Sequence, residues 1–281
     1  DTALGEALGK LYVERAFGAE AKRKALEMVA NLQASLRARL QRLDWMSEIT
    51  KAQALDKLDA MRVKIGYPDV WRDYSGLAID RTSYLQNVLA ARTFEFQRVL
   101  GKMGKPVDRT EWAASPITNN AFYDPTLNEL VFPAGILQPP FFDPEADDAA
   151  NYGNIGATIG HELTHGFDDS GRQFDAHGNL RDWWTAEDAT AFAGRAALMV
   201  KQFDAFEPLP GLHINGTLTL GENLADLGGL AVAYDAFRLA RHGGSDAVPQ
   251  NGFTPEQRFF LSYAETWRFK IREATLRVKL L

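Results

Sequence analysis

The chain has no cysteine in 281 residues, so no disulfide bond supports its fold. It also lacks any apolar run of about eighteen residues, the length that a membrane-spanning helix requires. Basic residues are not in excess, because 31 Lys and Arg are interleaved with 37 Asp and Glu, and this balance argues against a nucleic-acid-binding surface. The apolar content of 46% is that of an ordinary globular protein with a buried core.

Histidine is scarce, with five in the chain, and two of these stand in one short motif. Residues 161–165 read His-Glu-Leu-Thr-His. In an α-helix, positions i and i+4 lie on one face about one turn apart, so His161 and His165 can bind the same metal ion. Glu162 lies beside them as a general base for a metal-bound water. Residues 154–160 are uncharged, which indicates a buried helix whose polar side chains a metal would satisfy.

A zinc ion bound in this way needs a third protein ligand and keeps a fourth position for water. Residues 221–226 read Gly-Glu-Asn-Leu-Ala-Asp and offer Glu222 for this purpose. Asp226 follows one helical turn later, and we expect it to support catalysis by orienting a ligand imidazole. The sequence therefore predicts one zinc ion per chain, held by His161, His165 and Glu222.

Two known arrangements of zinc ligands in peptidases do not match the residues of this chain. A metzincin needs a glycine and a third histidine at fixed steps after His165, but those places hold Asp168 and Gly171. A close-spaced glutamate ligand would stand about twenty residues on, where residues 184–185 are Trp and Thr. Glu222 therefore remains the predicted third ligand.

The apolar spacing predicts a chain that is mostly helical. Helical patterns cover residues 25–43, 48–61, 82–101, 185–203, 222–241 and 254–272. Residues 121–123 and 130–132 read as the strands of a β-hairpin beside the site. Gly153, Gly156 and Gly160 recur in the zinc helix at three- and four-residue steps, which predicts close packing against another backbone. The expected class is α+β, mainly α-helical, with a small antiparallel sheet.

The two motifs at 161–169 and 221–226 together resemble the neprilysin family of zinc endopeptidases, which includes the endothelin-converting enzymes and bacterial oligopeptidase O. The match continues in five further segments, residues 11–14, 65–68, 120–123, 131–142 and 182–184. The resemblance thus covers nearly the whole chain. It implies a gluzincin, or thermolysin-like, catalytic lobe.

The resemblance also implies peptide substrates, cut on the N-terminal side of hydrophobic residues. It assigns Asn120 and Ala121 to a strand edge that pairs with the extended peptide. It assigns Ile136, Phe141 and Trp267 to the apolar pocket for the residue after the scissile bond.

Family chains are longer than this sequence. They carry a large helical region before the position of Asp1, and a His-Ser-Pro motif with a following arginine after that of Leu281. We therefore expect a helical segment over residues 1–110 that packs on a zinc catalytic domain over 111–281, truncated at its C-terminal end. The missing N-terminal region is an expected partner, and apolar helix faces within residues 1–100 should be exposed without it.

Three further expectations stay open at this stage. The resemblance favours a bacterial, extracytoplasmic location over a cytoplasmic one. A peptide-binding fragment with low or no activity is an alternative to a working endopeptidase. A zinc hydrolase of non-peptide amides is a second alternative, which a panel of small amides would separate from a peptidase.

Overall fold

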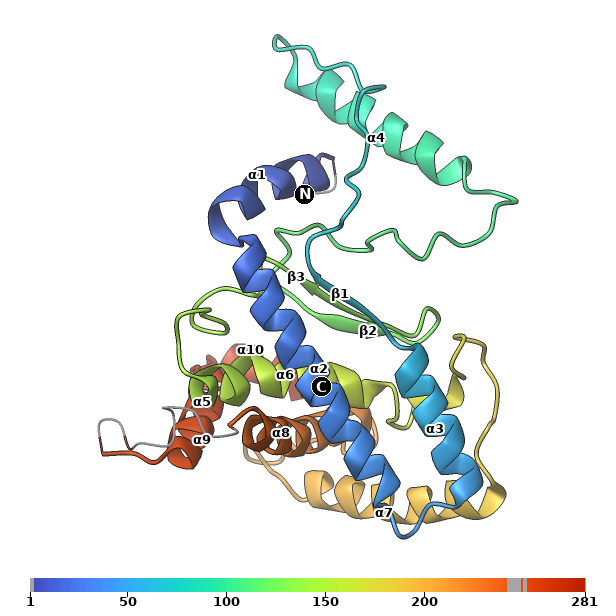
Figure 1. Ribbon diagram of the computed structural model, residues 1–281, viewed down its shortest axis with the longest axis vertical. Helices are drawn as coiled ribbons and strands as arrows, with labels where there is room; N and C mark the ends of the chain where they lie inside the picture. The colour runs from blue at the N-terminus through green and yellow to red at the C-terminus, as the bar shows by residue number, and fades with distance from the viewer. Residues whose placement is uncertain (1–2, 242–248, 250–251, 281) are drawn as a thin grey trace.

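A three-stranded sheet lies in the middle of the molecule, between a projecting helical arm and a layer of packed helices (Figure 1). The structure is a computed structural model that describes residues 3–241, 249 and 252–280. In chain order its elements are α1 (Gly5–Ala16), α2 (Ala19–Gln41), α3 (Glu48–Ala60), β1 (Arg62–Gly66), α4 (Tyr84–Leu100), β2 (Phe122–Asp124), β3 (Glu129–Pro133), α5 (Asp148–Asn151), the π-helical turn η1 (Tyr152–Gly156), α6 (Ala157–His165), the 3-10 turn η2 (Gly171–Gln173), α7 (Ala186–Asp204), α8 (Leu220–Ala240), α9 (Pro255–Thr266) and α10 (Glu273–Leu280).

The mostly helical α+β class is confirmed, and each predicted helix has a counterpart. A capping box opens α9, since Thr254 and Gln257 bond each other's backbone and Pro255 stands at the first helical position. The prediction that this helix continues to Arg272 is wrong. It stops after Thr266 because the N–H of Phe269 turns back onto the carbonyl of Trp267 at 2.8 Å, and α10 begins only at Glu273.

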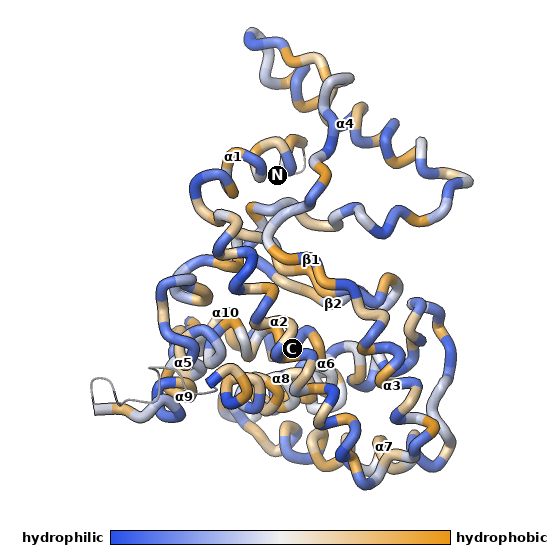
Figure 2. Tube along the Cα trace, viewed as in Figure 1, coloured by the Kyte–Doolittle hydropathy of each residue, from blue (hydrophilic) through white to orange (hydrophobic). Residues whose placement is uncertain are grey.

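The predicted hairpin is confirmed, with β2 and β3 antiparallel, but the expectation of an antiparallel sheet is wrong. β1 adds to the other side of β3 in parallel, with Lys64 opposite Val131. This strand was not predicted, because residues 62–66 directly follow the predicted helix and their partner strand lies far along the chain. The central strand β3 is buried along its whole length, and its Glu129 forms an ion pair with Lys64 at 2.8 Å. Figure 2 shows hydrophobic residues along the strands.

Close backbone contacts fix the helices below the sheet. A Cβ atom on Gly160 of α6 would lie 2.5 Å from the carbonyl oxygen of Gly229 on α8. A Cβ atom on Gly153 would lie 2.2 Å from the carbonyl oxygen of Phe259 on α9. The predicted backbone packing is therefore confirmed at these two glycines. It is wrong for Gly156, whose nearest neighbours belong to the preceding turn of its own helix.

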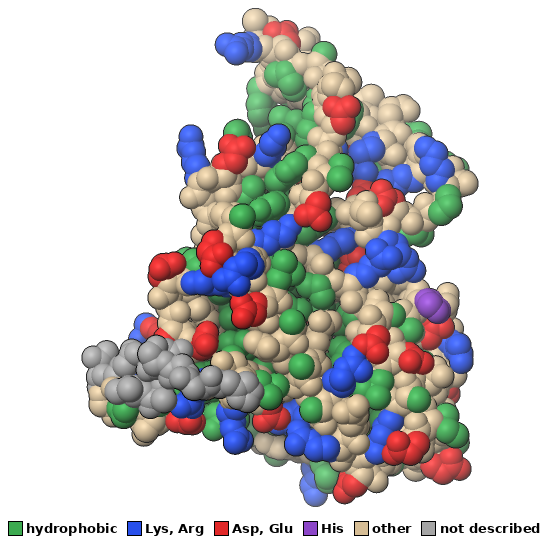
Figure 3. Space-filling view, viewed as in Figure 1, with side chains coloured by type: hydrophobic (Ala, Val, Ile, Leu, Met, Phe, Trp, Pro, Cys, Tyr) green, Lys and Arg blue, Asp and Glu red, His purple; other side chains and the backbone are tan. Residues whose placement is uncertain are grey.

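Residues 69–119, here termed the α4 arm, stand apart from the helical layer (Figure 1). Ala91 is the buried residue of α4. Large apolar side chains are exposed on α1 and on the arm, among them Leu8, Leu11, Val70, Tyr84, Leu85, Leu89, Phe96 and Met103. Figure 3 shows hydrophobic side chains at the surface around these elements. The expectation of exposed apolar faces in the first hundred residues is confirmed.

The N-termini of α3 and α7 share one buried carboxylate. Asp188 accepts hydrogen bonds from the Ser47 N–H at 2.9 Å, the Thr50 hydroxyl at 2.6 Å and the Thr185 hydroxyl at 2.9 Å. Burial alone would raise the pKa of Asp188, but these bonds outweigh it and lower the pKa to about 2. The ionised carboxylate therefore joins two helix N-termini, where the helix dipoles favour negative charge.

The α6–α8 contact predicts opposite effects of one substitution at two helical glycines. Gly229→Ala should lower the free energy of unfolding by at least about 2 kcal/mol, because the new methyl group would lie 2.3 Å from the backbone nitrogen of His161. Gly194→Ala on α7 is the control, since no atom lies within 4 Å of its added Cβ. It should raise stability by about 0.5–1 kcal/mol. Urea denaturation measures both, and a neutral Gly229→Ala would contradict the contact.

The hydrogen bonds of Asp188 predict that replacing this residue lowers stability by an amount that depends on pH. Asp188→Asn should destabilise the protein at pH 7 by about 2–4 kcal/mol, because buried donors lose a charged acceptor. The native pKa is depressed from 3.8, so the stabilisation is complete above that pH and is lost as the pH falls through about 2. The stability gap between wild type and variant, followed by urea denaturation, should therefore narrow across this range. A gap that stays constant would show that Asp188 is not ionised as described.

Candidate metal centre

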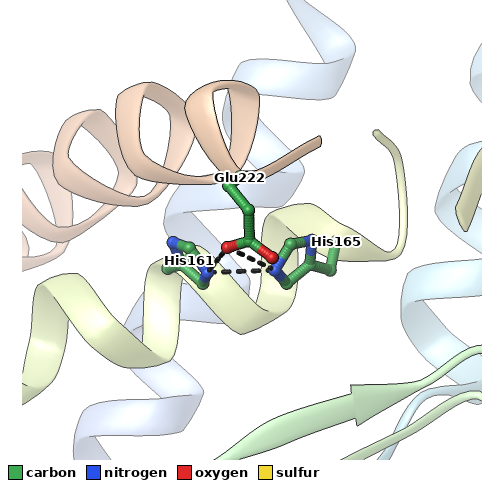
Figure 4. Close-up of side chains that lie close together, drawn as sticks. All are labelled: His161, His165 and Glu222. Carbon is green, nitrogen blue, oxygen red and sulfur yellow. Dashed lines mark hydrogen bonds and ion pairs between the residues drawn. The ribbon is translucent and has the colours of Figure 1, made fainter. Parts of the chain in front are cut away.

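Two adjacent helices bring the three predicted ligands together. His161 and His165 lie on one face of α6, and Glu222 reaches them from the first turn of α8 (Figure 4). The Nε2 atoms of the two histidines are 2.9 Å apart. The Oε2 atom of Glu222 is 3.2 Å from His161 Nε2 and 3.7 Å from His165 Nε2. Within the part of the chain that the structure describes, these three form the one group with metal-ligand geometry.

The Nδ1 atoms face away from this point and meet carboxylates. His161 Nδ1 is 2.8 Å from Asp226 Oδ1, and His165 Nδ1 is 2.7 Å from Asp168 Oδ2. An ionised carboxylate only accepts hydrogen bonds, so each Nδ1 must carry the ring proton. Both Nε2 atoms then present lone pairs to each other without a proton between them. Two lone pairs and a carboxylate converging in this way need a cation.

The arrangement fits zinc in donor type and in spacing. Imidazole nitrogen and carboxylate oxygen are both zinc ligands. Tetrahedral zinc with bonds of about 2.0–2.1 Å places its ligand atoms about 3.3 Å from one another. The ligand–ligand distances of 2.9, 3.2 and 3.7 Å lie on both sides of that value.

Asp168 is a residue of the site that sequence reasoning missed. Its Oδ2 faces His165, while its Oδ1 accepts the N–H groups of Ser170 at 2.9 Å and Gly171 at 2.6 Å. The signal was available, since an acid three residues after the second histidine lies one helical turn further on. Burial opposes protonation of His165, but the bond to Asp168 and the charge of Glu162 raise its pKa overall.

Glu162 lies on the same helix as the two histidines and is 7% exposed. Burial raises the pKa of its carboxyl group above the usual range, although the nearby His161 and His165 oppose the shift. The backbone N–H of Tyr123, in the edge strand β2, also favours the ionised form of this carboxylate and so lowers its pKa. A buried carboxylate with a raised pKa is a stronger base at neutral pH than an exposed one.

The site has an open side and a closed side. The side chains of His161 and His165 are 17% and 20% exposed, whereas those of Glu222 and Asp226 are 69% and 42% exposed. The point where the Nε2 atoms and the Glu222 carboxylate converge, here termed the metal point, is therefore open to solvent on the α8 side.

Asn120 and Ala121 lie just before β2, which is an edge strand of the described sheet. Asn120 is exposed and Ala121 is buried. β2 packs on α6, so residues 120–121 lie near the helix that carries His161 and His165.

The three predicted pocket residues differ in their surroundings. Ile136 belongs to the hydrophobic core, and Phe141 packs against it half-buried. The Phe141 carbonyl accepts the N–H of Ile155 at 3.2 Å, which ties this loop to the turn that leads into α6. Trp267 is about half exposed at the C-terminal end of α9, and its ring lies edge-on to Tyr263 at 6.3 Å. The described contacts do not join these three side chains into one pocket.

Comparison with known proteins gives consistent matches along the chain. Two sequence models of peptidase family M13 match residues 1–68 and 120–281. Human endothelin-converting enzyme-like 1 is 40% identical over 286 residues, which cover 99% of this chain and 37% of that protein. Neprilysin-1 of Caenorhabditis elegans is 44% identical, over 94% of this chain and 37% of that protein.

Solved structures similar to this chain are consistent with the sequence matches. Mycobacterium tuberculosis zinc metalloprotease Zmp1 in its open state is 48% identical with a TM-score of 0.89, over 99% of this chain and 44% of that one. PepO from Lactobacillus rhamnosis is 36% identical with a TM-score of 0.86, over 99% and 43%. The chain thus spans well under half the length of these relatives.

No helix in the described ranges has both the length and the apolar character needed to cross a membrane. The match to residues 120–281 alone spans more than half of the sequence and contains all three candidate ligands, so this chain belongs to peptidase family M13.

Proposed function

We propose that this chain carries the catalytic centre of a zinc metalloendopeptidase, with His161, His165 and Glu222 as metal ligands. The observation that carries the proposal is the pair of Nε2 atoms 2.9 Å apart, each left as an acceptor by a carboxylate at its Nδ1. Membership in peptidase family M13 and the likeness to zinc metalloprotease Zmp1 support the same chemistry.

Each polar residue around the ligands has a distinct task. Zinc bound here would supply Lewis-acid polarisation of the scissile carbonyl and activation of a water molecule. Glu162 accepts the proton of the attacking water and delivers it to the leaving amine, for which its raised pKa suits it. Asp226 and Asp168 hold the two imidazoles in the tautomer that leaves Nε2 free.

The proposed substrates are peptides cut before hydrophobic residues. The segment at Asn120 and Ala121 would pair with the peptide backbone, since it continues the edge strand β2. Ile136, Phe141 and Trp267 would line the pocket for the residue after the cut, and the half-exposed indole of Trp267 is the most accessible of them.

We also propose that residues 111–281 form the catalytic domain, with residues 1–110 packed on it. All three candidate ligands lie in the later part, and α2 packs against α8 from the earlier part. The exposed apolar side chains of α1 and the α4 arm support further chain of the same protein as their partner. The extracytoplasmic location stays a prediction of the resemblance.

Metal content tests the ligand set. Protein purified without added metal should contain about one zinc per chain, and Glu222→Ala should lose at least about tenfold in zinc affinity. The matched control is Glu187→Ala, because Glu187 is an exposed glutamate in the first turn of another helix, α7. Elemental analysis and chelator competition give the values. Unchanged affinity in Glu222→Ala would overturn the site.

Glu162→Gln separates the base from the ligands. The amide keeps the size of the side chain but cannot take a proton, so peptide turnover should fall by about 10²–10⁴-fold while zinc stays bound. Turnover of a fluorogenic peptide, at equal zinc occupancy, measures the loss. Glu14→Gln on the exposed face of α1 should be without effect. A Glu162→Gln protein that turns over normally would show that another group is the base.

A further inference from the structure

Lys57 of α3 is completely buried, although α3 contributes no ligand to the candidate site. Its ammonium group donates hydrogen bonds to the carbonyl oxygens of Gly171 and Phe174, each at 2.7 Å. Burying a lysine is costly unless its charge and donors are satisfied. Both acceptors lie in the turn that directly follows Asp168. The buried ammonium group is therefore hydrogen-bonded by one short segment next to the site.

Gly171 joins Lys57 to the candidate ligand His165. Its carbonyl accepts from Lys57, while its N–H donates to Asp168 Oδ1 at 2.6 Å. The other oxygen of Asp168 holds His165 Nδ1 at 2.7 Å. A Cβ on Gly171 would lie 1.8 Å from the His165 carbonyl oxygen, so the turn packs directly on the end of α6. One chain of hydrogen bonds therefore runs from α3 to the imidazole.

A second connection runs through Asn128. Its amide donates to the carbonyls of Lys57 at 2.9 Å and Ala176 at 3.1 Å, and its Oδ1 accepts the Tyr123 hydroxyl at 2.9 Å. The Tyr123 ring also flanks the Lys57 ammonium, at 5.8 Å, and the Tyr123 backbone N–H favours the ionised form of Glu162. The surroundings of Lys57 thus reach both the histidine ligand and the candidate base.

The charge of Lys57 faces buried acids. Burial lowers the pKa of Lys57 to about 8, and the carboxylates of Asp168 and Asp175 oppose that shift. Lys57 is therefore a cation at pH 7. Asp168 and Asp175 are themselves almost fully buried, and the Lys57 ammonium is a cation placed close to both of them.

We propose that Lys57 is a positioning residue of the metal centre, which holds the 171–174 turn so that Asp168 keeps His165 oriented toward the metal. The inference rests on the proposed zinc site. This positioning role differs from a general packing role, because here Lys57 affects zinc binding only through Asp168.

A double-mutant cycle on zinc affinity tests this route. Lys57→Met removes the donors and the charge at similar length, and Asp168→Asn removes the carboxylate that faces His165. Each single variant should weaken zinc binding about tenfold or more, measured by chelator competition on protein whose fold is verified by circular dichroism. In the Asp168→Asn background, Lys57→Met should change the affinity by less than about threefold, since both act through one link.

Lys22→Met is the matched control. Lys22 also donates to a backbone carbonyl, that of Tyr67 at 2.9 Å, and also stands over an aromatic ring, but its hydrogen-bond partners, Tyr67 and Asp69, are not residues of the candidate site. It should lower stability without changing zinc affinity. If Lys57→Met does not fold, Lys57→Gln replaces it in the cycle, because the amide keeps one N–H donor without the charge.

The outcomes separate the two proposals. Additive effects of Lys57→Met and Asp168→Asn, or an unchanged zinc affinity in Lys57→Met while Glu222→Ala loses zinc, would overturn the role of Lys57 alone. Unchanged affinity in Glu222→Ala would overturn the metal site itself. A loss in Lys22→Met equal to that in Lys57→Met would show that any buried lysine contact acts on the metal through general stability.

Discussion

The contact between the backbones of α6 and α8 is the constraint on which the site depends. Gly160 and Gly229 meet there without side chains, and a Cβ on either would lie within 2.5 Å of the other helix. This approach lets a short glutamate side chain from one helix reach two histidines on the other. A wider spacing would move Glu222 away from His161 and His165, so these glycines allow the three candidate ligands to meet although they supply no ligand themselves.

The carboxylates that orient the candidate histidine ligands come from two different sides of the site. Asp226 comes from α8 itself, but Asp168 sits in a turn that needs support of its own. Backbone N–H groups hold one of its oxygens, and Lys57 holds the carbonyl side of the same turn. Preorganised groups of this kind need not reorganise during a reaction, which is the usual source of electrostatic catalysis.

The parts of the site that could be predicted are those set by local geometry. The spacing of His161 and His165 on one helix face, the second acid motif at Glu222 and the capping box at Thr254 are all readable because helical periodicity fixes them. The strand β1 was missed because its partner is 67 positions further on, as the pairing of Arg62 with Glu129 shows (129 − 62). Lys57 was missed for the same reason, because its acceptors follow it by 114 and 117 positions.

The contrast between the two sides of the site indicates how a substrate would approach it. On the α3 side, Lys57, Asn128 and the turn after Asp168 fill the space with satisfied hydrogen bonds. On the α8 side, the Glu222 carboxylate is largely exposed. Among the described residues, the candidate site is therefore open to solvent on the α8 side, and the proposed peptide substrate would approach it there. Because β2 packs on α6, which carries Glu162, the proposed peptide laid along that edge would also lie near the proposed base.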